Sequence, residues 1–153
     1  MAGYVLGSSS RQNTGVATLA TTAAPDMDIY QLWRLTNAER QKAGMADLAL
    51  SSQLNSSASA KCTDMTQFDY WAHNNPNGKT PWDFIKATVP VYKIAGENLE
   101  FGVSNADQVV PLWMASPEHK GNVLNAAYTS VGFATCPGTA LHPRIVVQHF
   151  IGQ

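Results

Sequence analysis

Four side chains of this sequence have the chemistry of a polar site. Two are imidazoles, His73 in a loop dense in turn-forming residues and His119 near the start of a short helix, and two are carboxylates, Glu97 and Glu118. Two imidazoles with one or two carboxylates suffice for a general acid–base pair or for a zinc-type metal site. Each also has a plainer interpretation, as an exposed loop or helix-start residue or, for Glu97, as an acceptor of backbone N–H groups.

The spacing of these residues matches no compact catalytic or metal-binding motif. The sequence contains no His-Glu-x-x-His pair, no Gly-x-Ser-x-Gly turn and no phosphate-binding glycine loop. His142, beside a proline, and His149, within an apolar strand, are most simply structural. No nucleophile with a nearby base is evident, which weakens the case for a hydrolase.

The composition argues against several classes of protein. The chain has 153 residues, the size of one domain, with 14% charged residues and a formal net charge of −1. Its ten basic residues form no cluster, which argues against nucleic acid or an anionic membrane as a partner. No apolar run approaches the ~18 residues of a transmembrane helix, and the first residues lack the basic and apolar regions of a signal peptide.

The two cysteines leave two interpretations open, one long-range disulfide or two buried thiols. Cys62 and Cys136 are far apart, and no Cys-x-x-Cys pair is present, so a zinc knuckle and a thioredoxin-type motif are excluded. An even cysteine count in a low-charge chain rich in Asn, Ser and Thr favours an oxidised, extracytoplasmic protein.

Capping residues and apolar periodicity mark the elements that would position these side chains. Residues 1–25, rich in Gly, Ser, Thr and Ala, are expected to be a flexible leader or linker, and residues 26–153 one α+β domain. In the first half, the expected elements are a helix from about Asp26–Asp28 to Gly44, a helix after Ser51-Ser52 with Leu54, Ala58, Cys62 and Met65 on its apolar stripe, and a helix from Pro81 through Ile85 capped by Thr80. An irregular entry into a short strand follows over 92–102, and then a helix through Ala115 with a Ser104–Asp107 capping box. The chain is expected to end with a short helix after Ser116-Pro117 and antiparallel strands over 130–135 and 145–150.

Five blocks of the sequence, in this order, resemble the bacterial branch of the CAP superfamily, which includes cysteine-rich secretory proteins, antigen 5 and plant pathogenesis-related proteins of family 1. The blocks are "HNNPNGKTPWDFI", "AGENLEFG", "VVPLWMASPEHKGNVLN", "YTSVGFATC" and "VVQHFIG". The resemblance covers residues 28 to 153. It implies an α-β-α sandwich, with a small antiparallel sheet between helical layers, and a cleft lined by histidines and acidic residues.

The resemblance also assigns positions in that cleft. His73 matches the first histidine of the family, Glu97 the glutamate of the "GEN" block, and His119 the histidine of the bacterial block that begins "SP". Lys120 replaces the usual arginine of that block, and Glu118 stands where relatives often carry glycine. The eukaryotic tetrad is incomplete, because Ala127 and Ser116 occupy the positions of its second histidine and second glutamate.

From these matches we expect a secreted or cell-surface monomer that works as a binding module for a small-molecule, lipid, glycan or protein ligand. The alternative is a hydrolase using His73 or His119 with Glu97. We expect Glu97 to orient His73 or His119, and no cofactor to be required, although a weakly bound divalent metal such as zinc would find ligands in His73 and His119. We also expect a Cys62–Cys136 disulfide, since one cysteine falls on a helix stripe and the other at a strand end, and the family that the chain resembles is mostly secreted.

Overall fold

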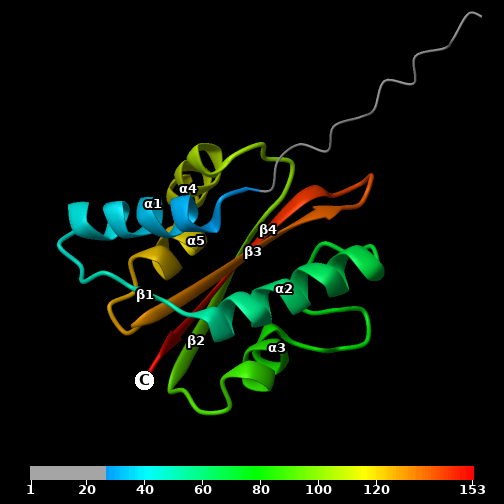
Figure 1. The fold of residues 1–153 in the computed structure, drawn as a ribbon, viewed down its shortest axis with the longest axis horizontal. Helices are drawn as coiled ribbons and strands as arrows, with labels where there is room; N and C mark the ends of the chain where they lie inside the picture. The colour runs from blue at the N-terminus through cyan, green and yellow to red at the C-terminus, as the bar shows by residue number, and fades with distance from the viewer. Residues whose placement is uncertain (1–26) are drawn as a thin grey trace, which may run out of the picture.

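The computed structural model describes residues 27–153 of the chain, drawn in colour in Figure 1. Its helices are α1 (Ile29–Lys42), α2 (Ser52–Gln67), α3 (Pro81–Thr88), α4 (Ala106–Ala115) and α5 (Pro117–Val123), and its strands are β1 (Ala49–Leu50), β2 (Ile94–Glu100), β3 (Ser130–Gly138) and β4 (Pro143–Gly152). The expected leader over 1–25 and the domain boundary at residue 26 lie outside the described residues. Within those residues, no helix is both long and apolar enough to cross a bilayer.

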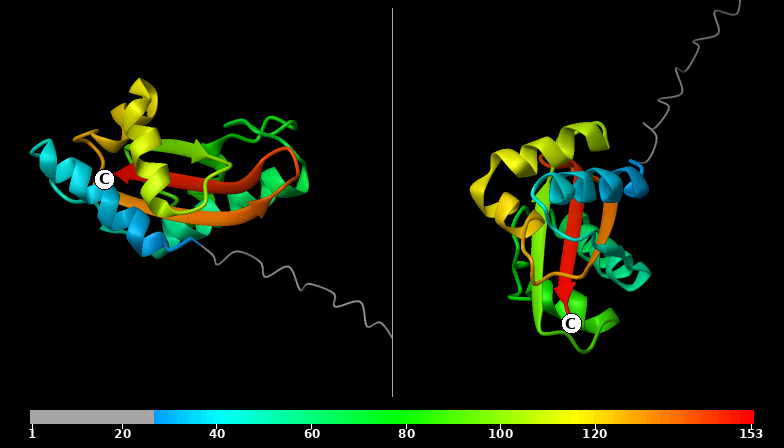
Figure 2. Two further views of the ribbon diagram at one scale, coloured as in Figure 1. Left: turned by 90° about the horizontal axis from the view of Figure 1, so that it is seen from above. Right: turned by 90° about the vertical axis from the view of Figure 1, so that its left-hand side faces the viewer.

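The sheet lies between two helical layers, as the family resemblance implied. Figure 1 shows α1, α4 and α5 on one side of the strands and α2 and α3 on the other, and the turned views of Figure 2 agree. On the first side, Leu32 of α1 and Trp113 of α4 are fully buried in a core with Phe150 of β4. On the second side, Met65 of α2 packs with Val147 of β4. The α-β-α sandwich is therefore confirmed.

The strands are ordered β1-β3-β4-β2. The expected antiparallel pair is confirmed as β3 and β4, while the two-residue β1 adds a short parallel pairing with β3 at one edge. The short strand expected within 92–102 is present as β2. It is longer and more regular than the expected irregular entry, since it pairs with β4 over its whole length, from Ile94 opposite Gly152 to Glu100 opposite Val146. Tertiary pairing overrides the weak local β propensity of its Gly, Glu and Asn residues.

Helix α2 covers the sheet at very close range. The predicted stripe is buried, and Ser51 caps the helix by accepting a hydrogen bond from the N–H of Leu54. A Cβ placed on Gly132 of β3 would overlap the backbone of Leu54 and Asn55, so glycine is needed where the helix meets this strand. The predicted disulfide is present and joins Cys62 of α2 to Cys136 of β3, with 6.1 Å between their Cα atoms.

Two helix starts show how the sequence signals work. At α3 Thr80 is the N-cap residue as predicted, and one carboxylate oxygen of Asp83 accepts from both its N–H and its hydroxyl. At α4 the expected Ser104 cap was wrong, because Asn105 caps the helix by accepting from the N–H of Gln108. Asn is as good an N-cap as Ser, and Asn105 directly follows Ser104 in the sequence.

Candidate functional site

The candidate site is built around one buried carboxylate in the middle of β2. The Glu97 side chain is only 1% exposed, and each of its oxygens meets a different imidazole. Oε1 lies 2.7 Å from Nδ1 of His73, and Oε2 lies 2.8 Å from Nε2 of His149. The His73 side chain is 58% exposed, whereas that of His149 is fully buried. Glu97 is therefore hydrogen-bonded to one exposed and one buried histidine.

Strand pairing places His149 at the site. It lies on β4 directly opposite Glu97 of β2 in the antiparallel register. Sequence reasoning left His149 as a structural residue and missed its contact with Glu97. The signal that would have found it is the pairing of the "GEN" segment with the last strand, but that segment was expected to enter a strand irregularly.

His149 in turn contacts a serine of α2. Its Nδ1 lies 2.7 Å from the hydroxyl of Ser57, which also bonds to the carbonyl oxygen of Leu54 at 3.0 Å. The order Ser57–His149–Glu97 resembles that of a hydrolase triad. Ser57 is fully buried, however, so its hydroxyl has no access to a substrate in solution.

A buried lysine anchors the loop that carries His73. The ammonium group of Lys61 donates to the hydroxyl of Tyr70 at 3.0 Å, to the carbonyl of Ala72 at 2.9 Å and to the carbonyl of His73. Burial lowers the pKa of Lys61, and the charge of Glu97 opposes that shift. Further along the same loop, the side chain of Asn75 accepts from two backbone N–H groups and closes the turn.

The pKa values of His73 and His119 are shifted in opposite directions. The hydrogen bond to Glu97 raises the pKa of His73, whereas burial lowers the pKa of His119. For Glu97, burial alone would raise the pKa of the carboxyl. Hydrogen bonds from His149 and His73 outweigh burial, so the pKa falls below its ordinary value.

His73 stands between two hollows, which together we call the His73 cleft. The first has a volume of about 310 Å³ and the second about 410 Å³. The first is lined by His73, Asn74, Pro81, Trp82, Ala95, Gly96, Glu97 and Asn122, and the second by Trp71, Ala72, His73, Leu99, Glu100, Phe101 and His119. The cleft thus combines exposed polar groups with aromatic walls.

The other two candidate residues take different positions. His119 shares the second hollow with His73, and its backbone carbonyl accepts from the side chain of Asn98 at 3.1 Å, which ties α5 to β2. Of the two histidines expected to contact Glu97, His73 does so and His119 does not. His149 makes the second contact instead. Glu118, in the first turn of α5, is exposed to solvent.

The donor set fits a resident metal poorly. Within residues 27–153, no group of three or more His, Cys, Asp or Glu side chains is arranged to hold a metal ion. Both oxygens of Glu97 already face imidazole nitrogens, and Nδ1 of His73 is engaged with Glu97. The weak zinc-type site at His73 and His119 stays a prediction, which zinc titration against a His73→Ala, His119→Ala double variant tests.

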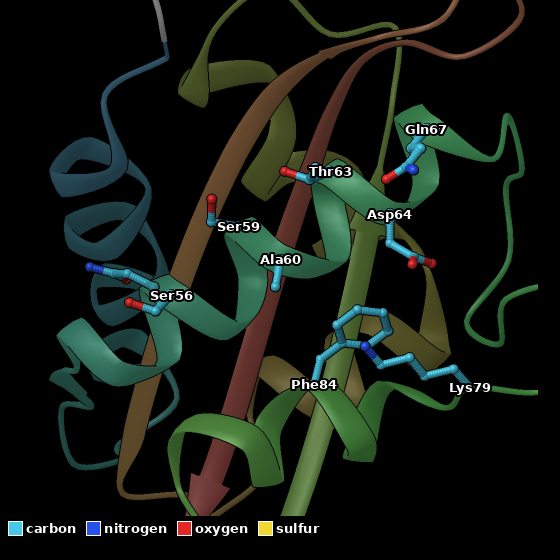
Figure 3. Close-up of a pocket in the computed structure, with 9 residues that line it drawn as sticks. Ser56, Ser59, Ala60, Thr63, Asp64, Gln67, Lys79 and Phe84 are labelled. Carbon is cyan, nitrogen blue, oxygen red and sulfur yellow. The ribbon is translucent and has the colours of Figure 1, made fainter.

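A separate groove follows the outer face of α2 and has a volume of about 670 Å³ (Figure 3). Small polar residues of α2, among them Ser59 and Thr63, line it together with Phe84 of α3. The ammonium group of Lys79 lies 3.8 Å from the centre of the Phe84 ring. None of the four candidate residues lines this groove, so we assign it no part in the site.

The chain is similar to known proteins in both sequence and structure. Residues 33–150 match the model of the cysteine-rich secretory protein family, CAP. The chain is 38% identical to the uncharacterised YkwD of Bacillus subtilis over 143 residues, which is 92% of this chain and 54% of that protein. The uncharacterised membrane protein YlbC of the same bacterium is 28% identical over 102 residues, 67% of this chain and 30% of that protein. The chain thus spans about half of the first relative and less than a third of the second.

Solved structures show the same fold. An extracellular protein with an SCP domain from Bacillus anthracis superposes with a TM-score of 0.74 at 26% identity, over 82% of this chain and 40% of that one. An outer surface protein from Borrelia burgdorferi gives a TM-score of 0.70 at 20% identity, over 86% of this chain and 99% of that one. The second likeness concerns the fold alone.

Proposed function

The chain belongs to the cysteine-rich secretory protein family, and on that premise we propose that it is a binding module whose His73 cleft takes a small ligand. One observation carries the proposal. His73 is exposed between two hollows, yet its ring is hydrogen-bonded to the buried Glu97 and its backbone carbonyl to the buried Lys61. A side chain held in place at a concave surface loses little conformational entropy when a ligand binds.

The charges around the cleft favour a neutral ligand. Glu97 and Glu100 line it and Glu118 lies close enough to act on the pKa of His73, while the permanent positive charge that acts on His73 among residues 27–153 is that of the buried Lys61. A free anionic group, such as a fatty-acid carboxylate, would meet this excess of acidic groups. The aromatic walls suit an apolar face, so we favour a neutral glycan or another small molecule that has both polar and apolar faces.

A hydrolase is the second candidate. Its support is the His73–Glu97 pair, which could act as a general base oriented by a carboxylate. Ser57, which contacts His149, is buried, so a water molecule would have to be the nucleophile. We place this function below binding for that reason.

We propose further that the protein is secreted or displayed at the cell surface. The Cys62–Cys136 disulfide supports an oxidising compartment, where such bonds persist. The similar protein from Bacillus anthracis is described as extracellular, and the one from Borrelia burgdorferi as an outer surface protein.

Amide NMR spectra of labelled protein titrated with defined probes would test the binding function. Suitable probes are a neutral chitin oligosaccharide, palmitate and a short peptide, each also monitored for cleavage. We expect the oligosaccharide to shift signals of cleft residues, and Trp82→Ala to abolish those shifts because Trp82 is a wall of the first hollow. Tyr30→Ala is the matched control, since Tyr30 is an exposed aromatic residue of α1.

Several outcomes would decide against the proposal. Probe cleavage that depends on His73 would favour the hydrolase. Shifts that map outside the cleft and survive Trp82→Ala would show that another surface binds. Palmitate binding with an affinity above that of the oligosaccharide would refute the charge argument.

A further inference from the structure

Two buried residues behind the cleft are not explained by packing alone. Ser57 of α2 and His149 of β4 are fully buried and line neither hollow, yet they continue the hydrogen-bond chain that ends at His73. We propose that Ser57 and His149 are positioning residues that hold Glu97, so that His73 in its neutral form carries its proton on Nδ1 and presents an unprotonated Nε2 to the cleft. This inference rests on the proposed function, because it takes His73 as the residue that meets the ligand.

The positions of the protons on His73 and His149 follow from their hydrogen bonds to Glu97. An ionised carboxylate only accepts hydrogen bonds, so an imidazole nitrogen within 2.8 Å of Glu97 must carry a proton. Those nitrogens are Nδ1 of His73 and Nε2 of His149. A neutral imidazole has one N–H, so Nε2 of His73 and Nδ1 of His149 are unprotonated acceptors.

Ser57 completes the assignment in the interior. The unprotonated Nδ1 of His149 needs a donor. The hydroxyl of Ser57 has a single proton and two acceptors within reach, Nδ1 of His149 at 2.7 Å and the carbonyl oxygen of Leu54 at 3.0 Å, and the assignment gives that proton to the shorter contact with His149. The opposite arrangement would put a proton on Nδ1 as well and leave a charged imidazolium in a fully buried position. Ser57 therefore lets His149 stay neutral while it donates to Glu97.

Lys61 supplies the second anchor of the site. Its ammonium group fixes the backbone carbonyl of His73, and its charge helps to keep Glu97 ionised. The ring of His73 is thus held through Glu97, and its backbone through Lys61. Both anchors come from buried groups, so the orientation of His73 exists before any ligand arrives.

The consequence concerns the chemistry of the ligand. An unprotonated Nε2 accepts a hydrogen bond, so neutral His73 recognises a donor such as a hydroxyl or an amide N–H. A ligand that offers only acceptors gains nothing from this nitrogen. The class of ligand is therefore a neutral molecule with a donor group placed to reach His73.

Histidine-labelled protein studied by long-range proton–nitrogen NMR at alkaline pH gives a direct test. We expect His73 to show Nδ1 protonated and Nε2 bare, and His149 to show the reverse. The Nδ1 proton of His73 should be visible in slow exchange, because Glu97 holds it. A wild-type spectrum with the proton of His73 on Nε2 would overturn the assignment without any variant.

Variants then test the positioning role. His149→Leu removes the donor to Glu97, and we expect the His73 Nδ1 proton signal to broaden or vanish. His149→Gln can still donate through its amide and should retain that signal. Ser57→Ala should weaken the signal, whereas Ser56→Ala, which changes an exposed serine of the same helix bonded only within α2, should not.

The readout needs a folded variant but no bound ligand. Amide spectra and melting curves identify a variant that fails to fold, and Ser57→Ala and the wild-type assignment still decide the question in that case. An unchanged His73 Nδ1 signal in folded His149→Leu and Ser57→Ala would refute the positioning role. Since no ligand is used, a failure here is distinct from a failure of the binding function.

Discussion

Removal of the Cys62–Cys136 disulfide is the perturbation whose cost follows most directly from the structure. The bond closes a loop with a sequence separation of 74 residues. In the chain-entropy model, a loop of this length raises the free energy of unfolding by about 4.4 kcal/mol at 25 °C, as an upper figure. We expect a Cys62→Ala, Cys136→Ala variant to lose most of that amount.

The loss is large enough to measure in two ways. With a denaturant slope of about 2 kcal/mol per molar urea, the unfolding midpoint would fall by about 2 M. The melting temperature of a chain this size would fall by on the order of 10–20 °C. Both measurements compare the variant with oxidised wild-type protein at the same pH and protein concentration.

The cross-link and the packing of Cys62 contribute separately to the free energy of unfolding, and a second variant distinguishes the two contributions. Cys62 is buried among Met65, Ile145 and their neighbours, so its loss also removes apolar contacts. Cys136→Ala breaks the cross-link but leaves the buried Cys62 side chain in place. The two variants should therefore lose similar amounts, with the double variant lower by no more than about 1–2 kcal/mol.

Two results would refute this reasoning. A loss below about 1 kcal/mol in Cys136→Ala would show that the cross-link does not restrict the unfolded chain as the model assumes. Two free thiols found by a thiol assay on denatured, unreduced protein would show that the bond does not form at all.

Three further predictions concern the site and its supports. Gly132→Ala should lower the free energy of unfolding by more than about 2 kcal/mol in urea titrations, because its Cβ would collide with the α2 backbone, whereas Gly121→Ala, with open space around it, should be neutral or slightly stabilising. Lys61→Met should cost about 2–4 kcal/mol in the same assay, since it strands the buried acceptors at the start of the His73 loop, and a loss under 1 kcal/mol would contradict that anchoring role. Because the pKa of His73 is raised above 6.5 and that of Glu97 is lowered below 4.5, their pairing should stabilise the fold most between pH 4.5 and 6.5, and the gain should fade as pH rises through the pKa of His73 or falls through that of Glu97. Unfolding curves across pH check this, and a Glu97→Gln protein that keeps the same pH profile would rule it out.

The sequence predicted best those features that are local and periodic. The stripe from Leu54 to Met65 follows from spacing within α2, and the Thr80 cap from the Thr80-Pro81 start of α3, and each occurs where it was expected. A short strand was expected within 92–102, but the length and regularity of β2 were not, because its Gly-Glu-Asn residues have low β propensity alone. They form a strand because β4 lies beside them, and this is a contact between residues about 50 positions apart.

The sequence predicted only part of the site, because some of its residues meet only through contacts between distant parts of the chain. His73 and Glu97 stood out as polar residues in quoted blocks, and the structure brings them together. His149 and Lys61 did not stand out, because a histidine in an apolar strand and a lysine in a helix have common structural explanations. Only the three-dimensional pairing shows that His149 faces Glu97 and that Lys61 points inward to the His73 loop.

Stability and site architecture meet in helix α2. Ser57 and Lys61 both belong to it, and Lys61 precedes the disulfide-bonded Cys62 in sequence. Burying the carboxylate of Glu97 is unfavourable unless donors and positive charge compensate it, and α2 supplies the hydroxyl that supports His149 as well as the ammonium group of Lys61. A shift of α2 against β3 would therefore disturb Glu97 and the His73 loop together. It follows that the cross-link holds in register the one element on which both anchors of His73 depend, so its reduction should loosen the His73 cleft before the fold is lost.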